Sequence, residues 1–549
     1  MEKYFISYTA NGEKFTAKSS KTPHFTVETE KNGNRTTVIL NAETPVTIDK
    51  FMIALDYSYK EDQRIFVNGY QSWTDSKEYF LDEEMTELSK FAERYVHNSL
   101  VKKIGLGKSG DYAFCDYPRQ KGVFYGFSYG YVRSGSIVDI FGSLSERCGF
   151  TIVRFDVEKS QVIIEKELEG VVFSGRQTVA DYAVISGEYD AAFDEYFELM
   201  GVKCLQNETK CGYTTWYNYY GNVTQDIVMR DLESLSRLGE KVDIFQIDDG
   251  YQKAIGDWTE TKEEKFPDGM KMIADEIHKK DMLAGLWLAP LAATRNSSIY
   301  QNHRDWLVHD EKGKPYCAGH NWGGFFALDI YNEEAREYIR NFFNVILNDW
   351  GFDMVKLDFL YAACVLPIHG KSRGEVMCDA MDLIRDCVGD KLILGCGVPL
   401  MPTFGKVDFC RVGADVDLCW KHKKHRTRED VSTPNTVNCS IFRRHLNGRA
   451  FLNDPDVFLL RDNNLDMTFE QKELLAKINS IFGSLLFVSD NVAEYSDKQT
   501  EVFLNTIKKK DVKIISAEYS ERNIINVEYT VDGEAQTLKF NSETGEIIK

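Results

Sequence analysis

The stretch Gly351-Phe-Asp-Met-Val-Lys-Leu-Asp-Phe359 has the pattern of a short buried β-strand that ends in charged side chains. Met354 and Val355 supply the apolar run. Side chains two positions apart share one face of a strand, so Lys356 and Asp358 point the same way. A buried lysine–aspartate ion pair can serve structure alone. Other predicted strands of this chain also end in charged groups, and this recurrence favours a functional cluster.

Alternating strand and helix patterns begin at about residue 211. The segments between the strands have apolar residues at i, i+3 and i+4, the period of a helix packed on one face. The predicted strands are 211–217, 242–249, 283–290, 353–359, 391–396, 408–414, 449–454 and 485–489. The predicted helices are 225–238, 269–280, 334–349, 373–387 and 469–482. Eight strands alternating with helices predict a central (β/α)₈ TIM barrel, whose active site forms at the C-terminal ends of the strands.

The sequence on either side of this region is β-rich. Residues 36–40 and 161–165 before it, and 512–516 after it, are short runs of β-branched and other apolar residues. We therefore expect a multidomain protein in which the barrel is flanked by two β domains. The expected boundaries are 1–205 for an N-terminal β-sandwich, 206–492 for the catalytic barrel and 493–549 for a small C-terminal antiparallel β-sheet domain.

Composition excludes several classes of protein. The 549 residues are 43% hydrophobic with a net charge of −19, which argues against binding to nucleic acid or anionic membranes. The basic runs 421–426 and 508–510 are interpreted as solvated loops. No window of about 18 apolar residues suggests a membrane span. The N-terminus lacks the pattern of a secretory signal, so a cytoplasmic location is expected.

Cysteine usage predicts neither disulfides nor zinc. The 12 cysteines are irregularly spaced, and no pair has the C-x-x-C spacing of a metal or redox motif. Several lie inside apolar runs, so most are expected to be reduced and buried.

The predicted strands end in polar or aromatic groups. These ends are Trp216-Tyr-Asn, Gln246-Ile-Asp-Asp-Gly250, Trp287, Lys356-Leu-Asp358, Cys396, Arg411-Val-Gly-Ala-Asp415 and Asn453-Asp454. Inward-facing layers of such a barrel come from alternate strands, so the ends of the second, fourth and sixth strands can converge. Those three ends carry Asp248, Asp249, Asp358 and Asp415.

A pocket with several carboxylates, a lysine, an arginine and tryptophan walls suits a sugar. Charged groups bind vicinal hydroxyls, and an aromatic face packs on the apolar side of the ring. Three carboxylates could instead bind a divalent metal. Lys356 and Arg411 are close strand neighbours of these acids and already offset their charge, which favours the sugar.

The strand-end motifs resemble one known family. Across the barrel, in order, they are Trp216-Tyr, Phe245-Gln-Ile-Asp-Asp-Gly-Tyr-Gln252, Gly285-Leu-Trp287, Val355-Lys-Leu-Asp358, Cys396-Gly397, Arg411-Val-Gly-Ala-Asp415 and Leu452-Asn-Asp-Pro-Asp456. Together they resemble glycoside hydrolase family 36, the retaining α-galactosidases. The expected domain layout before and after the barrel is similar too.

The resemblance implies a role for each matching residue. Asp358 would be the nucleophile and Asp415 the general acid/base. Asp248 and Asp249 would hold the 4- and 6-hydroxyls of galactose, with Lys356 at the 3- and 4-hydroxyls. Arg411 and Cys396 would lie near the 2-hydroxyl. Aromatic walls would come from Trp73, Trp216, Trp258 and Trp287, with Trp73 reaching the pocket from a loop of the N-terminal domain. Neither a metal nor another cofactor is implied.

The resemblance predicts an exo-acting enzyme that hydrolyses short α-galactosides of the melibiose or raffinose type. A retaining enzyme needs two carboxyl groups about 5–5.5 Å apart. Lys356 is expected to keep Asp358 ionised, whereas burial or the charge of Asp358 would keep Asp415 protonated. Asp417, two residues past Asp415, is interpreted as a loop or cap carboxylate.

Several alternatives stay open. Cys396-Gly397 continues into Val398-Pro399 rather than a Ser/Gly-rich loop, so the tolerance for a 2-acetamido group is undecided and α-N-acetylgalactosaminidase is the nearest alternative. A raffinose-type galactosyl transferase would use the same residues. A metal-dependent lyase and an inactive sugar-binding protein are the non-hydrolase alternatives. The expected partner is a small oligosaccharide, and a homo-oligomeric state stays open.

Overall fold

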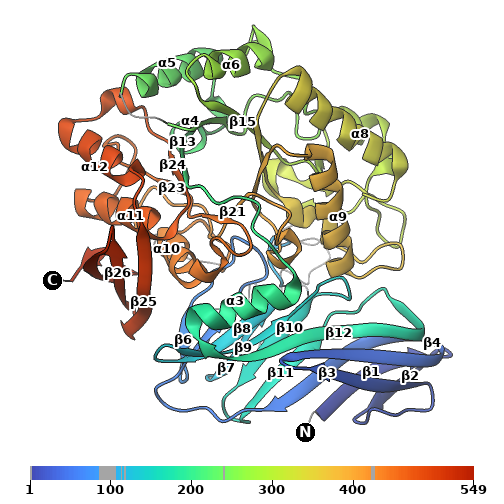
Figure 1. Cartoon of the computed structure of the whole chain (residues 1–549). Helices are drawn as coiled ribbons and strands as arrows, with labels where there is room; N and C mark the ends of the chain where they lie inside the picture. Colours follow the sequence, from blue (N-terminus) through green and yellow to red (C-terminus); the bar gives the residue numbers. More distant parts are fainter. Residues whose placement is uncertain are drawn as a thin grey trace.

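The computed structural model describes residues 3–85, 107–112, 114–115, 119–238, 242–421 and 427–548. Residues 422–426, most of the first predicted basic run, lie outside this part of the chain. Figure 1 shows a ring of helices around parallel strands, a broad antiparallel sheet below it and a small sheet beside it.

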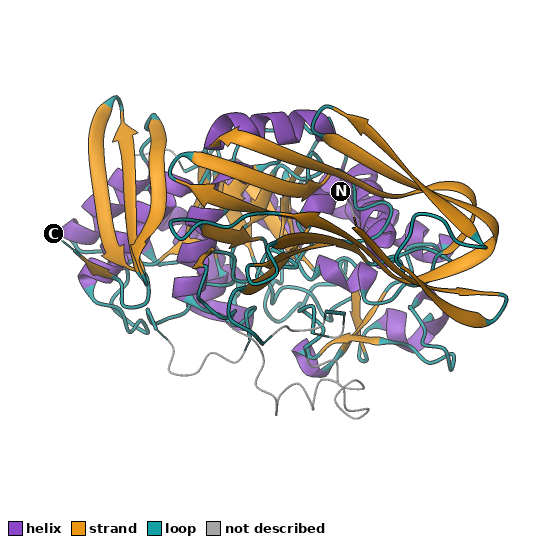
Figure 2. Cartoon of the chain, turned by 90° about the horizontal axis from the view of Figure 1, so that it is seen from below, coloured by secondary structure: helices purple, strands orange, loops and turns teal. Residues whose placement is uncertain are grey.

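The described N-terminal region forms a twelve-stranded antiparallel sheet. Its strands are β1 (Lys3–Ala10), β2 (Glu13–Ala17), β3 (Phe25–Asn32), β4 (Arg35–Asp56), β5 (Arg64–Val67), β6 (Glu78–Phe80), β7 (Val123–Phe127), β8 (Tyr129–Ser134), β9 (Ile137–Ser143), β10 (Thr151–Asp156), β11 (Gln161–Lys166) and β12 (Val172–Glu188). The long strands β4 and β12 pair with each other and with strands on both sides, which curves the sheet around its own apolar core. Figure 2 shows these strands from below. Helix α3 (Tyr189–Met200), which the sequence analysis missed, follows directly.

A curled parallel sheet forms the centre of the molecule. Its strands are β13 (Lys210–Thr214), β14 (Ile244–Ile247), β15 (Leu283–Leu288), β19 (Met354–Leu357), β20 (Leu392–Gly395), β21 (Phe409–Arg411), β22 (Leu452–Asp454), β23 (Val457–Phe458) and β24 (Leu485–Val488). The order β22-β21-β20-β19-β15-β14-β13-β24-β23 has consecutive chain segments, β22 and β23, at its two edges. The seventh strand of the sheet is therefore in two parts. β22 lies within the predicted 449–454 and pairs with the sixth strand, and β23 lies beyond the predicted bounds and pairs with the eighth. Between them is Pro455-Asp456, where Asp456 has a left-handed φ of 71°.

The described helices around this sheet include the five predicted ones and four that were not predicted, of which the last, at 497–507, lies in the region expected to form the C-terminal β domain. They are α4 (Trp216–Tyr219), α5 (Gln225–Ser236), α6 (Gly269–His278), α7 (Ser298–Asn302), α8 (Glu333–Asn344), α9 (Arg373–Val388), α10 (Thr433–Phe442), α11 (Phe469–Phe482) and α12 (Asp497–Ile507). Side-chain caps begin several of them, with Thr224 before α5, Ser372 before α9 and Thr468 before α11. The sequence analysis missed α10 because all ten of its residues are buried, which leaves no polar face to give a helical period.

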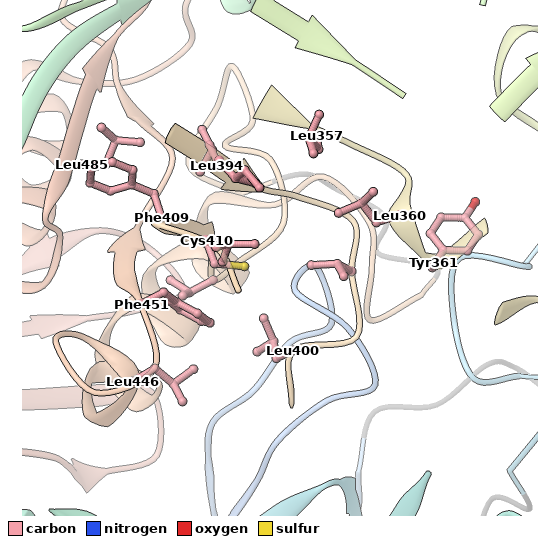
Figure 3. Close-up of a cluster of buried hydrophobic side chains, with 14 of the residues drawn as sticks. Leu357, Leu360, Tyr361, Leu394, Leu400, Phe409, Cys410, Leu446, Phe451 and Leu485 are labelled. Carbon is pink, nitrogen blue, oxygen red and sulfur yellow. The ribbon is translucent and has the colours of Figure 1, made fainter. Parts of the chain in front are cut away.

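Apolar side chains of the parallel strands fill the interior. Figure 3 shows part of this core, with Leu357, Leu360, Tyr361, Leu394, Leu400, Phe409, Cys410, Leu446, Phe451 and Leu485 labelled. Because the strands are buried on both faces, they are continuous apolar runs rather than alternating patterns. This packing fixes the strand ends, and therefore the polar side chains that follow them.

Two smaller sheets complete the fold. The C-terminal sheet has the order β25-β26-β27-β28, with β25 (Val512–Glu521), β26 (Ile524–Val531), β27 (Glu534–Asn541) and β28 (Glu546–Ile547). The other lies between the third and fourth parallel strands and contains β16 (Ala292–Thr294), β17 (Cys317–Gly319) and β18 (Phe325–Ala327). The sequence analysis did not anticipate this insertion. In the described residues, no helix is both long and apolar enough to cross a membrane.

Candidate active site

Three parallel strands bring the predicted acids together. The Nζ of Lys356, on the fourth strand, lies 2.8 Å from Asp248 Oδ2, at the end of the second. Asp248 Oδ2 also accepts hydrogen bonds from Gln246 at 2.7 Å and Thr214 at 3.3 Å. Burial is the largest single effect and lowers the pKa of Lys356, but Asp248, Cys396 and Asp358 together outweigh it and leave the pKa above its usual value. Lys356 therefore remains charged, and its closest carboxylate is Asp248.

Asp358 is held by two donors at the end of the fourth strand. Its Oδ1 accepts the backbone N–H of Phe359 at 2.8 Å, and its Oδ2 accepts Nε1 of Trp287 at 3.1 Å. Burial raises the pKa of Asp358, Lys356 opposes the rise and Asp415 adds to it. The net direction is upward, so Lys356 does favour the ionised form as expected, but burial has the larger effect.

Asp415 is the more exposed of the two expected catalytic acids. Its side chain is 35% exposed, and its Oδ1 lies 2.9 Å from Nη1 of the buried Arg411. Burial of Asp415, one of the possibilities expected from the sequence, is only partial in this structure. Its charge is close enough to raise the pKa of Asp358, so the two acids lie near each other.

Arg411 is fixed by a cluster of acids that the sequence analysis left without a role. Its Nε lies 2.9 Å from Asp454 Oδ2, and its Nη2 lies 2.7 Å from Asp456 Oδ1. Burial raises the pKa of Asp456 to about 7, against the charge of Arg411. Tyr217 donates its hydroxyl to Asp456. The sequence signal for these two acids is the Asp-Pro-Asp run at 454–456, at the end of the seventh strand.

A loop from the N-terminal sheet brings Trp73 beside the ends of the fourth and fifth strands. Its Nε1 lies 3.4 Å from Sγ of Cys396, and its ring meets Phe359 edge-on with centroids 5.2 Å apart. Arg443, fully buried, fastens the loop by donating to Asn68 Oδ1 at 2.9 Å and to the carbonyl of Ser72 at 2.8 Å. Burial raises the pKa of the Cys396 thiol well above its usual value, so this group is a neutral thiol.

The other predicted tryptophans occupy different depths. Trp287 donates to Asp358, as described above, and Trp258 packs behind it with ring centroids 5.9 Å apart. Trp258 is fully buried, so its surface faces protein rather than the mouth. Trp216 begins α4, is half-buried and packs edge-on against Tyr220.

Asp249 has a partner that the sequence analysis did not foresee. Its Oδ1 accepts from Gln252 at 2.6 Å, and its Oδ2 accepts from Nε1 of Trp322 at 3.1 Å. Trp322 comes from the small inserted sheet, more than seventy positions along the chain. A tryptophan followed by Gly323-Gly324 in a long interstrand segment was the available signal.

Part of the sequence matches a known family and several curated proteins. The Melibiase family model matches residues 204–365. The α-galactosidase Mel36A of Lactobacillus acidophilus is 29% identical over 150 residues, which is 26% of this chain and 20% of that protein. An α-galactosidase of Escherichia coli is 30% identical over 292 residues, which is 51% of this chain and 38% of that one.

Solved structures extend the match over the whole chain. The α-galactosidase TtGalA of Thermus thermophilus, in complex with p-nitrophenyl α-D-galactopyranoside, aligns with a TM-score of 0.72 at 22% identity, covering 97% of this chain and 98% of that one. The GH36 α-galactosidase AgaA of Geobacillus stearothermophilus aligns with a TM-score of 0.62 at 12% identity, covering 94% and 72%. The resemblance to the family 36 α-galactosidases is confirmed.

The comparisons differ in how much of each protein they cover and in what they show. The sequence alignments cover less than two-fifths of the length of those two relatives. The structural matches, at such low identity, establish the fold that this chain shares with the family 36 enzymes. The site described above lies partly within the Melibiase match, which includes Asp248, Asp249, Lys356 and Asp358, and partly beyond it.

Proposed function

We propose that this chain is a retaining, exo-acting α-galactosidase that hydrolyses terminal α-linked galactose through a covalent galactosyl-enzyme. The observation that carries the proposal is the pairing of Asp358 with Asp415. One is buried and held by neutral donors, whereas the other is partly exposed and held by Arg411. Two carboxyl groups in one site with different surroundings suit the two roles of a retaining glycosidase.

Asp358 is proposed as the nucleophile. Hydrogen bonds from Trp287 and from the backbone N–H of Phe359 fix the plane of its carboxylate. An oriented nucleophile needs little reorganisation to attack the anomeric carbon. The α-galactosyl bond breaks as the bond from Asp358 to the anomeric carbon forms. Water then reverses the step and restores the α configuration.

Asp415 is proposed as the acid/base. It protonates the departing glycosidic oxygen and later takes a proton from the attacking water. A partly exposed side chain suits a group that must exchange a proton with solvent in each cycle. Arg411, fixed by Asp454 and Asp456, sets where the carboxyl group of Asp415 lies.

The remaining polar groups are proposed to bind the sugar. Asp248, Asp249 and Lys356 would hold the 4-, 6- and 3-hydroxyls, and Arg411 with the neutral thiol of Cys396 would lie beside the 2-hydroxyl. Trp73, Trp216 and Trp287 would form walls. Trp258, which packs behind Trp287, is proposed to support that wall instead of touching the sugar.

The domain assignment is part of the same proposal. The curled parallel sheet and the helices α4 to α11 would form a (β/α)₈ catalytic barrel at 206–492, with α12 just past this boundary. Residues 1–205 would form the N-terminal β-sandwich domain, which supplies Trp73, and 493–549 the C-terminal β-sheet domain.

A 2-acetamido sugar is the second candidate substrate. One relative, the A type blood α-D-galactosamine galactosaminidase of Flavonifractor plautii, is 32% identical over 164 residues. Against this activity, the backbone next to Cys396 is closely packed by Trp73 and Phe359. A Cβ atom at Gly397 would lie 2.7 Å from the ring of Trp73 and 2.9 Å from the backbone nitrogen of Phe359. We therefore favour the unsubstituted 2-hydroxyl.

A panel of nitrophenyl α- and β-glycosides, assayed with and without EDTA, tests the proposal. The α-galactoside should be turned over fastest, and EDTA should not change the rate. A higher kcat/KM for the α-N-acetylgalactosaminide would select the second candidate, and loss of activity in EDTA would favour a metal-dependent reaction. Transfer of galactose to a second sugar at the expense of water would identify a transferase. Faster turnover of intact galactomannan than of melibiose would overturn the exo-acting assignment.

A further inference from the structure

Trp322 is a strained aromatic residue at the mouth of the site. It lies in the turn that joins β17 to β18 and is 37% exposed. Its φ of 53° is left-handed, and Gly323 and Gly324 follow with φ of 80° and 107°. Bulky side chains seldom adopt this conformation, and residues held in it gather at functional sites. A glycine or asparagine would fit the turn more easily, so the tryptophan needs another reason.

The indole of Trp322 links the two halves of the proposed pocket. Its Nε1 donates to Asp249 Oδ2 at 3.1 Å, at the end of the second strand. Its ring lies against Phe359, with centroids 4.7 Å apart, and against Trp287, with centroids 6.1 Å apart. Phe359 directly follows Asp358, the proposed nucleophile, and Trp287 donates a hydrogen bond to the Asp358 carboxylate. Trp322 is therefore positioned by groups that also position Asp358.

Asp249 and Asp248 differ in how the protein holds them. Lys356, Gln246 and Thr214 converge on Oδ2 of Asp248, and the backbone N–H of Asp249 donates to its Oδ1. Among the residues that the structure describes, Asp249 accepts from one neutral donor on each oxygen, Gln252 on Oδ1 and Trp322 on Oδ2.

The donors on Asp249 leave it able to bind more. A carboxylate oxygen can accept two hydrogen bonds, so each oxygen of Asp249 keeps an acceptor position. Burial raises the pKa of Asp249, while the bonds from Gln252 and Trp322 oppose the rise and favour the ionised acceptor.

We propose that Trp322 is a specificity-determining positioning residue that acts through Asp249. By occupying one acceptor position of Oδ2, the indole N–H turns the other toward a galactose hydroxyl, and the ring covers this side of the carboxylate. The inference rests on the proposed function and adds that recognition of the hydroxyl at Asp249 depends on a residue of the inserted sheet. Trp322 itself takes no part in breaking the glycosidic bond.

The test compares Trp322→Phe with two controls. Phenylalanine keeps an aromatic ring and removes the donor. Trp350→Phe makes the same chemical change just before β19, at the other end of the strand from Asp358. Asp249→Ala removes the acceptor itself. Each variant is assayed on 4-nitrophenyl α-D-galactoside and on its 4-deoxy and 6-deoxy analogues, with thermal melting as a check on folding.

Trp322→Phe should lower kcat/KM on the galactoside by roughly 10- to 100-fold, the range for a hydrogen bond to a charged group. The loss should fall mainly on KM, because the hydroxyl is bound before the reaction as well as during it. On whichever analogue lacks the hydroxyl bound by Asp249, the loss should be no more than about 3-fold. Asp249→Ala should show the same dependence on the analogue. Trp350→Phe should not change the ratio of kcat/KM on the galactoside to kcat/KM on either deoxy analogue.

Each other outcome is informative. Equal losses on all three substrates, with a lower melting temperature, would show that Trp322 only supports the fold and would overturn the inference. An unchanged substrate ratio in Trp322→Phe, alongside a changed ratio in Asp249→Ala, would overturn it as well. If the unmodified protein turns over no α-galactoside, the proposed function fails first, which is a distinguishable result.

Discussion

The second, fourth and sixth strands of the parallel sheet have aspartates at both ends, and the two ends use them differently. Just before these strands lie Asp243, Asp353 and Asp408, each of which accepts the backbone N–H of a residue on a neighbouring strand. The donors are Cys211 at 2.9 Å, Ala284 at 3.1 Å and Ile393 at 2.9 Å, respectively. These carboxylates satisfy strand N–H groups where regular pairing begins, which is a structural task.

The acids at the other end contact side chains of the proposed site. Asp248 is held by Lys356, Asp358 by Trp287 and Asp415 by Arg411. Residue type and strand are the same in both sets, so neither distinguishes structure from chemistry. The two sets are distinguished by the end of the strand at which they lie and by the identity of the donor. The C-terminal ends of the strands are where the active site of such a barrel forms.

The largest expected effect is at Asp358. Asp358→Gly should lower turnover of 4-nitrophenyl α-D-galactoside by at least about 10⁴-fold, because no covalent intermediate can form. Stability should change little, since the site is built for reaction. Added azide should enter on the vacated side and give the β-galactosyl azide, which NMR of the product identifies. An α-linked azide, or residual activity within tenfold of the parent, would remove Asp358 from the role of nucleophile.

The next effect separates Asp415 from Asp417. Asp415→Ala should slow substrates with poor leaving groups, such as melibiose, by about 10²- to 10⁴-fold, and an activated aryl galactoside far less. Azide should restore turnover and give the α-galactosyl azide. Asp417 is a matched control, because its Oδ1 accepts the backbone N–H of Leu418 at 2.7 Å, as a loop carboxylate does. If Asp417→Ala shows the leaving-group dependence and Asp415→Ala does not, our acid/base assignment is wrong.

Local patterns in the sequence were sufficient to locate the parallel strands and their acidic ends. An apolar run of four to six residues, such as Leu283–Leu288, identifies a buried strand without knowledge of its neighbours. The division of the seventh strand was not predictable in this way. It depends on the left-handed backbone of Asp456, whose oxygens are held by Arg411, Tyr217 and the N–H of Val416.

Long-range contacts also limited the prediction of the site. Trp258, Trp287 and Trp322 are all tryptophans in segments near strand ends, and the sequence does not show their depth. Packing places Trp258 behind Trp287 and brings Trp322 out of an inserted sheet to Asp249. A hydrogen bond between residues 73 positions apart has no local signature. The acids were found because each follows its own strand, and Lys356, Trp287 and Arg411, which hold three of them, were found for the same reason. Trp322 on Asp249 was not found.

The smallest expected effect tests the structural end of the comparison. Asp353 Oδ2 accepts from Ala284 N–H and lies 2.7 Å from Nε2 of His278, and its Oδ1 lies 2.8 Å from Nζ of Lys391. Burial acts to raise the pKa of Asp353, but the bonds from Lys391, His278 and Ala284 outweigh it and leave the pKa below its usual value. A carboxyl group whose pKa is lowered by folding stabilises the protein above the unfolded pKa of about 3.9. That stabilisation is lost as the pH falls through the lower folded pKa.

Asp353→Asn should therefore reduce the free energy of unfolding by about 1–2 kcal/mol at pH 7. Urea titrations should show that the difference in free energy of unfolding between wild type and variant narrows below about pH 4, because the wild-type carboxyl becomes protonated.

Because Asp353 lies at the closed end of the strand, kcat/KM on the α-galactoside should stay within about twofold of the parent at pH 7. Asp358→Asn, on the same strand, should give the reverse pattern, with activity lost and stability kept. A stability loss in Asp353→Asn that is equally large at pH 7 and pH 3, or a fall in kcat/KM comparable to that of Asp358→Asn, would show that the two ends of the strand are not functionally distinct.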